Sequence, residues 1–119
     1  MSNNLPTIQI LFTNDFKRKI RALAKRYRHI QSDLQPIIEN IQAGNFVGDQ
    51  ISGIGYVVLK VRLKNSDIQK GKSAGYRLIY HIESPTMILF LLIYSKSDIN
   101  DIAPAEIRDI IAEFYHENN

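Results

Sequence analysis

Four segments of the chain have the short apolar patterns of β-strands. They cover residues 8–12, 56–63, 76–82 and 87–94. The last is a continuous apolar run, which is typical of a strand buried on both faces and is far too short for a membrane-spanning helix. Four residues, 83–86, separate it from the strand before it, and Ser-Pro-Thr at 84–86 makes a tight connection. The pair is therefore predicted to form an antiparallel hairpin.

Three further segments have the spacing of amphipathic helices. The first follows Thr13 or Asn14, either of which can cap its start. The second is predicted to begin at Ser32, which has capping-box spacing with a Gln three residues later, and to stop at Gly44. The third begins near Pro104. The predicted apolar stripes are Phe16, Ile20, Leu23, Ala24 and Tyr27 in the first helix, Ile37, Ile38 and Ile41 in the second, and Ile107, Ile110, Ile111 and Phe114 in the third.

The element order is therefore β-α-α-β-β-β-α, with residues 45–55 irregular. This order predicts a small α/β (α+β) domain in which an N-terminal helical hairpin packs on an antiparallel sheet and leaves the other sheet face open. At 119 residues and 45% hydrophobic content, the chain is expected to form one domain over residues 1–119.

Composition excludes several classes of site. The chain has no cysteine, so disulfides, thiolate zinc sites and a cysteine nucleophile are ruled out. Residues 1–13 lack the basic and apolar regions of a secretory signal. We therefore expect a cytoplasmic protein with no membrane partner.

The charge is distributed unevenly along the chain. Residues 17–28 hold seven cations and no acid, whereas residues 98–119 hold six acids and one cation. A third segment, residues 60–77, holds six of the fifteen Lys and Arg residues and one acid. Such concentrations favour a polyanionic partner, with nucleic-acid phosphate the first candidate.

The basic segment at 60–77 has a definite geometry. Alternation places Lys60, Arg62 and Lys64 on one face of a strand. A glycine-containing loop with Lys70 and Lys72 follows, and Arg77 begins the next apolar run. A strand face, a loop and a second strand thus bring cations together.

RNA is a suitable substrate for such a surface because it carries its own nucleophile, the 2′-hydroxyl. Fixed cations stabilise the extra charge of the pentavalent transition state, and a base and an acid must move protons. His81 is the only histidine near this region, and its apolar surroundings favour a structural role. Position on adjacent strands makes five residues the catalytic candidates: Lys60, Arg62, Arg77, Tyr94 and Lys96. No metal signature is visible, and Asp98 and Asp101 have the pattern of solvated loop acids.

Three segments resemble the RelE/HigB/ParE superfamily of type II toxin–antitoxin toxins. They are residues 60–64, the Gly-Tyr-Arg at 75–77, and Leu-Leu-Ile-Tyr-Ser-Lys-Ser-Asp at 91–98. Residues 70–77 are most similar to the HigB-like branch. The resemblance is specific over 56–102 and rests over 8–44 on element order and a basic first helix.

The resemblance implies a toxin that cuts mRNA in the ribosomal A site, without metal or other cofactor, and that a cognate antitoxin silences. Lys60 and Arg62 match positions for proton transfer and phosphate binding, and Arg77 matches the arginine that holds the scissile phosphate. Lys96 falls in the basic segment after the last strand. Lys64, Lys70 and Lys72 are expected to hold flanking RNA, and Lys17, Arg18 and Arg21 to contact ribosomal RNA.

Two departures from the family pattern keep alternatives open. Ser97 follows Lys96 where many members have a second cation, and residues 100–103 lack the tyrosine of some members, for which Tyr94 is the candidate substitute. One alternative is a ParE-like inhibitor of DNA gyrase. The other is a non-catalytic, decayed toxin that binds RNA. The acidic last helix either completes the core or covers the basic surface.

Overall fold

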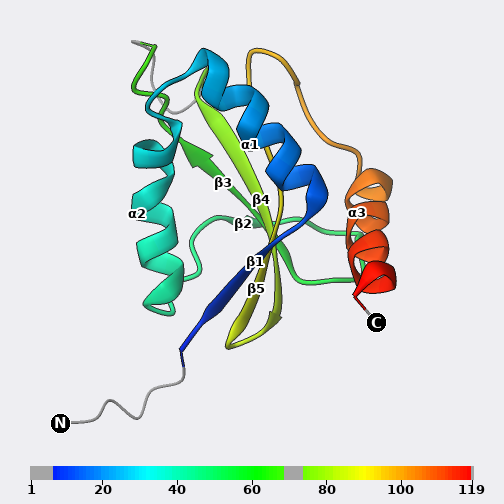
Figure 1. The fold of residues 1–119 in the computed structure, drawn as a ribbon. Coiled ribbons are helices and arrows are strands. Elements are labelled where there is room, and N and C mark those ends of the chain that lie inside the picture. The colour runs from blue at the N-terminus through cyan, green and yellow to red at the C-terminus, as the bar shows by residue number, and fades with distance from the viewer. Residues whose placement is uncertain (1–6, 69–73, 119) are drawn as a thin grey trace, which may run out of the picture.

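The computed structural model describes residues 7–68 and 74–118, and its elements follow the predicted order (Figure 1). The predicted RNA-binding residues Lys70 and Lys72 lie outside the described residues. A two-residue strand, β2, adds to the prediction within the stretch expected to be irregular. The elements are β1 (Gln9–Phe12), α1 (Asn14–Arg26), α2 (Ile30–Gln42), β2 (Asp49–Gln50), β3 (Val58–Leu63), β4 (Tyr76–Ser84), β5 (Met87–Ser95) and α3 (Pro104–Glu117).

The five strands form one sheet in the order β1-β5-β4-β3-β2. The predicted hairpin is confirmed, because β4 and β5 pair antiparallel across a turn of two residues, Pro85 and Thr86. β3 also pairs antiparallel with β4. Among the described strands, β1 alone runs parallel to its neighbour, and it pairs with the first four residues of β5.

Thr13, rather than Asn14, caps α1. Its backbone is extended, and its Oγ1 accepts a hydrogen bond of 3.0 Å from the N–H of Phe16. The same hydroxyl donates to the carbonyl oxygen of Leu91 at 2.7 Å. Since the Thr13 side chain is buried, one residue both starts the helix and ties it to β5.

The predicted start of α2 is wrong. The helix begins at Ile30, and Ser32 forms no capping box but donates its hydroxyl to the carbonyl oxygen of His29. His29 caps the helix without a side-chain bond, while the carboxylate of the distant Asp67 accepts from both the His29 N–H and its ring Nδ1. The predicted stop is confirmed, because Gly44 adopts φ +85°, which favours glycine.

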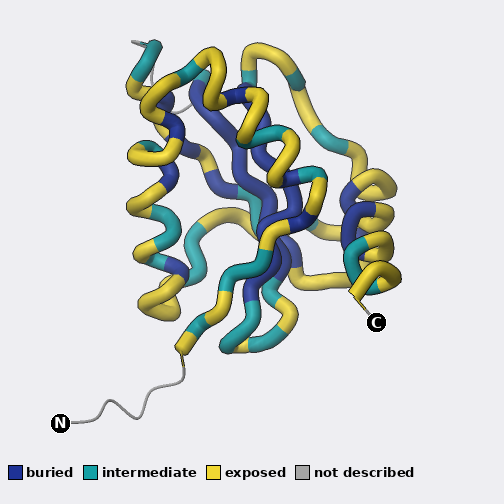
Figure 2. The backbone as a smooth tube through the Cα atoms, in the orientation of Figure 1, coloured by how far each residue is buried: buried dark blue, intermediate teal, exposed yellow. Residues whose placement is uncertain are grey.

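The sheet has helices on both faces (Figure 1). Residues of α1 and α2, among them Phe16, Leu23 and Leu34, pack with Leu78 and Phe90 on one face. The central strands β4 and β5 are buried along most of their length (Figure 2).

The prediction of an open second sheet face is wrong. Ile107, Ile110 and Ile111 of α3 pack there with Ile79 and Tyr94. The last helix thus completes the core, as its apolar stripe predicted. Within α1 one predicted core residue is wrong, since Ala24 is exposed.

Candidate functional site

Three of the predicted catalytic residues form a row across the sheet. In the strand register Arg62 of β3 lies opposite Arg77 of β4, and Arg77 lies opposite Tyr94 of β5. Residues directly opposite one another share a sheet face, with Cβ atoms about 5 Å apart. The register thus places two arginine side chains on neighbouring strands of one sheet face, where both can contribute to binding an anion.

Lys60 extends this row along β3. It lies two residues before Arg62 and therefore on the same face. Its Nζ donates to the Asp101 Oδ1 at 3.2 Å. The Asp101 carboxylate also accepts from the N–H of Ile102, and this bond and the one from Lys60 hold the pKa of Asp101 below its usual value. The loop before α3 therefore places the Asp101 carboxylate against the candidate catalytic residue Lys60.

The members of the row differ in exposure. Arg62 is exposed, whereas Arg77 is 5% exposed and Tyr94 is 2% exposed. The Arg77 Nη1 donates to the carbonyl oxygen of Tyr76 at 3.1 Å. A phosphate approaching from solvent thus meets Arg62 first, and contact with Arg77 requires movement of the groups around it.

Burial also limits what Tyr94 can do chemically. Loss of contact with water raises the pKa of its hydroxyl, and the nearby Asp101 adds to the rise. The hydroxyl therefore keeps its proton near neutral pH. It is suited to donate a hydrogen bond and unsuited to act as a general base.

Lys96 is close to the row but directed elsewhere. Its Nζ donates to the carbonyl oxygen and to the Oδ1 of Asn100, four residues later in the same loop. The prediction that Lys96 belongs to the site stays a prediction. Lys64 follows the end of β3 and is exposed, as a residue that holds flanking RNA must be.

Gly75 fixes the start of β4, two residues before Arg77. A Cβ at this position would lie 2.0 Å from the carbonyl oxygen of Leu63 and 3.0 Å from the N–H nitrogen of Asn65. The carbonyl oxygen of Gly75 accepts from the N–H of Lys96 at 2.9 Å. The glycine of the Gly-Tyr-Arg motif thus permits the close approach of backbones that positions the arginine.

Two carboxylates that the sequence did not single out anchor the turn after β3. Asp33 of α2 accepts from the N–H and the hydroxyl of Ser66, at 2.9 and 3.0 Å. Asp67 binds His29 at the start of α2, and these bonds hold the pKa of Asp67 below its usual value. These contacts join elements far apart in the chain, so local patterns give no signal for them.

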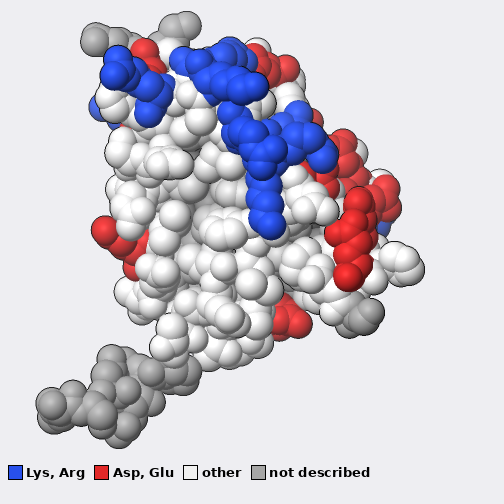
Figure 3. All heavy atoms as spheres, in the orientation of Figure 1, with Lys and Arg blue, Asp and Glu red and all other residues white. Residues whose placement is uncertain are grey.

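The cations of α1 form a second basic surface. At 3.6 residues per turn, Lys17, Arg18, Arg21 and Lys25 fall within about 100° of arc on the side away from the core. All four are exposed, and Figure 3 shows Lys and Arg gathered over α1 and acidic side chains along α3. Arg18 pairs with Asp15, whereas none of the ion pairs found among the described residues involves Lys17, Arg21 or Lys25.

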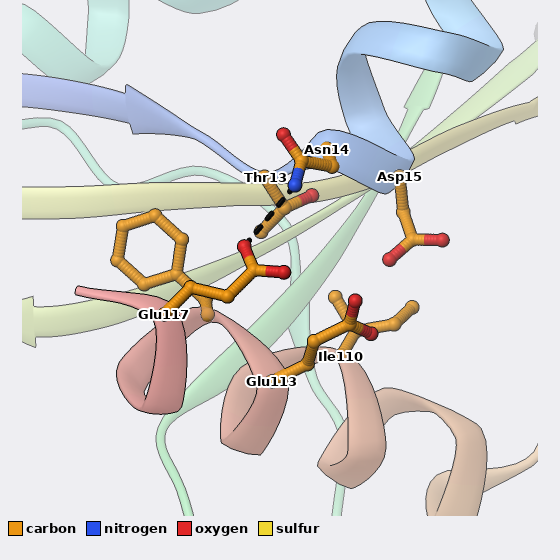
Figure 4. A pocket seen from close by; sticks show the side chains of 7 residues that line it. Thr13, Asn14, Asp15, Ile110, Glu113 and Glu117 are labelled. Carbon is orange, nitrogen blue, oxygen red and sulfur yellow. Dashed lines mark hydrogen bonds between the residues drawn. The ribbon is translucent and has the colours of Figure 1, made fainter.

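Acidic side chains meet where α1 begins. Asp15, Glu113 and Glu117 border a small hollow between α1 and α3, and the Asn14 Nδ2 donates to the Glu117 Oε2 at 3.1 Å (Figure 4). This bond braces α3 against the start of α1. In the described part of the chain, no group of three or more His, Asp or Glu side chains has an arrangement that could hold a metal ion.

His81 is structural, as its apolar surroundings predicted. It is buried, its Nδ1 lies 2.9 Å from the carbonyl oxygen of Val57, and its Nε2 lies 3.2 Å from the hydroxyl of Tyr115. Because a carbonyl only accepts, Nδ1 carries a proton, and in the neutral ring Nε2 accepts from the Tyr115 hydroxyl. The pair fastens α3 to the sheet.

One known protein family matches nearly the whole length of the chain. The family model described as RelE toxin of the RelE/RelB toxin–antitoxin system matches residues 9–116, from β1 to the last turns of α3. No curated protein matches the chain. No helix within residues 7–68 and 74–118 has the length and apolar character needed to cross a membrane.

Proposed function

The chain belongs to the RelE toxin family of toxin–antitoxin systems, and we propose that it is a ribosome-dependent endoribonuclease that cuts mRNA during translation. The observation that carries this proposal is the row of Arg62, Arg77 and Tyr94 across three strands, with Lys60 beside it. A gyrase inhibitor does not need cations aligned in this way, whereas a phosphodiesterase does.

The reaction uses the nucleophile that RNA supplies. The 2′-oxygen attacks the adjacent phosphorus, and the bond from phosphorus to the 5′-oxygen of the next nucleotide breaks. The products are a 2′,3′-cyclic phosphate and a 5′-hydroxyl. One proton leaves the 2′-hydroxyl for a base, and one proton reaches the departing 5′-oxygen from an acid. The protein mainly aligns the chain and stabilises charge.

The row suggests a role for each residue. Arg62 and Arg77 hold the non-bridging oxygens of the scissile phosphate. Lys60, on the same face of β3, is placed for proton transfer or charge stabilisation. Tyr94 donates a hydrogen bond, because burial keeps its hydroxyl protonated. Lys96 joins them if RNA draws it away from Asn100.

Two further surfaces are proposed to hold RNA outside the row. Lys64 lies beyond β3 and, with Lys70 and Lys72, contacts flanking nucleotides. Lys17, Arg18 and Arg21 contact ribosomal RNA phosphates from the opposite side of the sheet, the side on which α1 packs. Replacing these three α1 cations by Glu is expected to weaken ribosome binding and to reduce its salt dependence by about one unit of slope for each phosphate that is no longer neutralised.

The proposal is tested by inducing wild-type protein, Arg77→Ala and Arg62→Gln separately in a bacterial host and mapping mRNA 5′ ends in the first minutes. Wild type is expected to produce new ends inside translated reading frames, and both variants to produce few or none. Arg62→Gln matters because Arg62 is exposed, so its loss leaves the core intact. Arg108→Gln, which removes an exposed cation on α3, is the matched control and should cut like wild type.

Other outcomes would change the assignment. Growth arrest without such cuts would indicate a target other than mRNA, and a supercoiling assay would then test DNA gyrase. Neither cuts nor arrest would indicate a toxin that has lost its activity.

A further inference from the structure

A groove lies beside β5 where β1 ends. β1 pairs with residues 87–90 of β5, and in the described part of the chain no strand continues along residues 91–95 on that side. The chain leaves the sheet at Thr13 to begin α1. Side chains of α1 and of the loop after β5 fill this place incompletely and leave a cavity of about 220 Å³.

The walls of this groove are mostly apolar. Ala22 and Leu23 of α1 line one side, Ile93 of β5 the floor, and Ile99 the side formed by the following loop. A single water needs only about 10–15 Å³ of such space, so the groove has room for a large apolar side chain. An apolar cavity of this size favours a branched or aromatic anchor over water.

The rim of the groove is positive. Lys19 and Arg26 lie on the flank of α1 that carries Ala22 and faces the groove. One acid, Asp98, also lines the groove, and its Oδ2 is bound by the Arg26 Nη1. The other cations of α1 lie on the adjoining, solvent-facing side of the helix. A segment that fits here carries acidic side chains on either side of its apolar anchor.

We propose that this groove is where the antitoxin docks, through a segment with one large apolar side chain flanked by acidic residues. The inference rests on the toxin role stated in the proposed function, but not on the chemistry of RNA cleavage. The segment continues along β5 in the place that a longer β1 would take. Its acids contact Lys19 and Arg26, and they replace Asp98 as the partner of Arg26.

Two exposed alanines of α1 provide a matched test. Ala22 lines the groove, whereas Ala24 is not among its lining residues. Ala22→Trp fills the cavity without disturbing the core, and Ala24→Trp adds the same bulk elsewhere on the helix. The measurement is binding of the cognate antitoxin, by calorimetry, after thermal unfolding has shown that each variant folds.

The expected result is at least a tenfold loss of antitoxin affinity for Ala22→Trp and less than a twofold change for Ala24→Trp. Lys19→Glu is expected to weaken binding more at low than at high salt. Equal affinities for wild type and Ala22→Trp would overturn the proposal, and so would equal losses in both tryptophan variants. Loss of ribosome binding in Ala22→Trp with antitoxin binding retained would also overturn it, because the groove would then bind RNA.

mRNA cleavage without antitoxin, measured in parallel, separates this inference from the proposed function. If no toxin variant cuts mRNA but Ala22→Trp still loses antitoxin affinity, the docking proposal is supported and the proposed nuclease activity is refuted. If every variant cuts mRNA and all bind the antitoxin equally, the proposed nuclease activity is supported and the docking proposal is refuted.

Discussion

Replacing Asp101 by Asn tests whether the loop before α3 competes with RNA at the candidate site. Asp101 accepts from Lys60 at 3.2 Å, so its carboxylate competes with an RNA phosphate for the charge of Lys60 and repels that phosphate. Asn keeps an oxygen that can accept from the Ile102 N–H but removes the charge. Asp101→Asn is therefore expected to increase RNA affinity.

The exposure of the pair sets the size of this effect. The side chain of Lys60 is 33% exposed and that of Asp101 is 72% exposed, so water screens the attraction. Exposed ion pairs contribute about 0.2 to 1 kcal/mol, which corresponds to a gain in affinity of about 1.4- to 5-fold. The gain should shrink as salt is raised towards 1 M, where the screening length falls to about 3 Å.

The assay is fluorescence anisotropy with a labelled RNA that carries 2′-O-methyl groups, because such an RNA binds without being cut. Asp98→Asn is the matched control, since it removes one acid from the same loop but from Arg26 instead of Lys60. Asp101→Asn should gain affinity over Asp98→Asn, and the difference should vanish when Lys60→Gln is added to both. Equal gains in the two variants would refute the reasoning, because net charge alone would then explain them.

Three further predictions concern stability. Gly75→Ala forces a Cβ to within 2.0 Å of the carbonyl oxygen of Leu63 and should lower the free energy of unfolding in urea by about 2–4 kcal/mol. Gly44→Ala, which brings no atom within 4 Å of the new Cβ, should lower it by about 1 kcal/mol because of the positive φ. Similar losses in the two variants would refute the close approach at Gly75 as the cause. Thr13→Val removes a buried hydroxyl that caps α1 and binds β5, and should cost about 1–3 kcal/mol by thermal unfolding, while Thr13→Ser should keep most of that stability. Burial raises the pKa of Tyr80 to about 12, above its unfolded value near 10, so its contribution is fully present below pH 10 and is lost as pH rises towards 12. Unfolding free energies measured from pH 8 to 12 should therefore fall less steeply for Tyr80→Phe, and an unchanged slope would show that Tyr80 is not the cause.

Local signals in the sequence were sufficient for most of the fold. The apolar run at 87–94 and the Ser-Pro-Thr before it predicted the central hairpin, because a two-residue turn leaves little freedom of strand direction. Gly44 marked a helix end because glycine accepts a positive φ, and Pro104 marked a helix start because proline fixes φ at a value suited to the first turn. The start of α2 was missed because its N-cap residue, His29, makes no side-chain cap bond and is held by Asp67, which is distant in the chain.

The candidate site was only partly predictable. Alternation placed Lys60 and Arg62 on one face, but their alignment with Arg77 depends on the register across residues 64–75, which no local pattern fixes. The burial of Tyr94 follows from the packing of α3 on the sheet. The contact between Asp101 and Lys60 was also missed, since two residues 41 positions apart give no spacing signal.

The most direct test of the proposed nuclease uses purified ribosomes programmed with a defined mRNA whose A-site codon has either all ribonucleotides or single 2′-deoxy substitutions. Wild-type protein is expected to cut the all-ribo message and to leave a 2′,3′-cyclic phosphate without added metal. It is expected not to cut when the nucleotide 5′ of the cut lacks its 2′-hydroxyl. Arg62→Gln should be strongly impaired on the same message. Cleavage of the deoxy-substituted message at the same position, or a product that ends in a 3′-hydroxyl, would contradict the account.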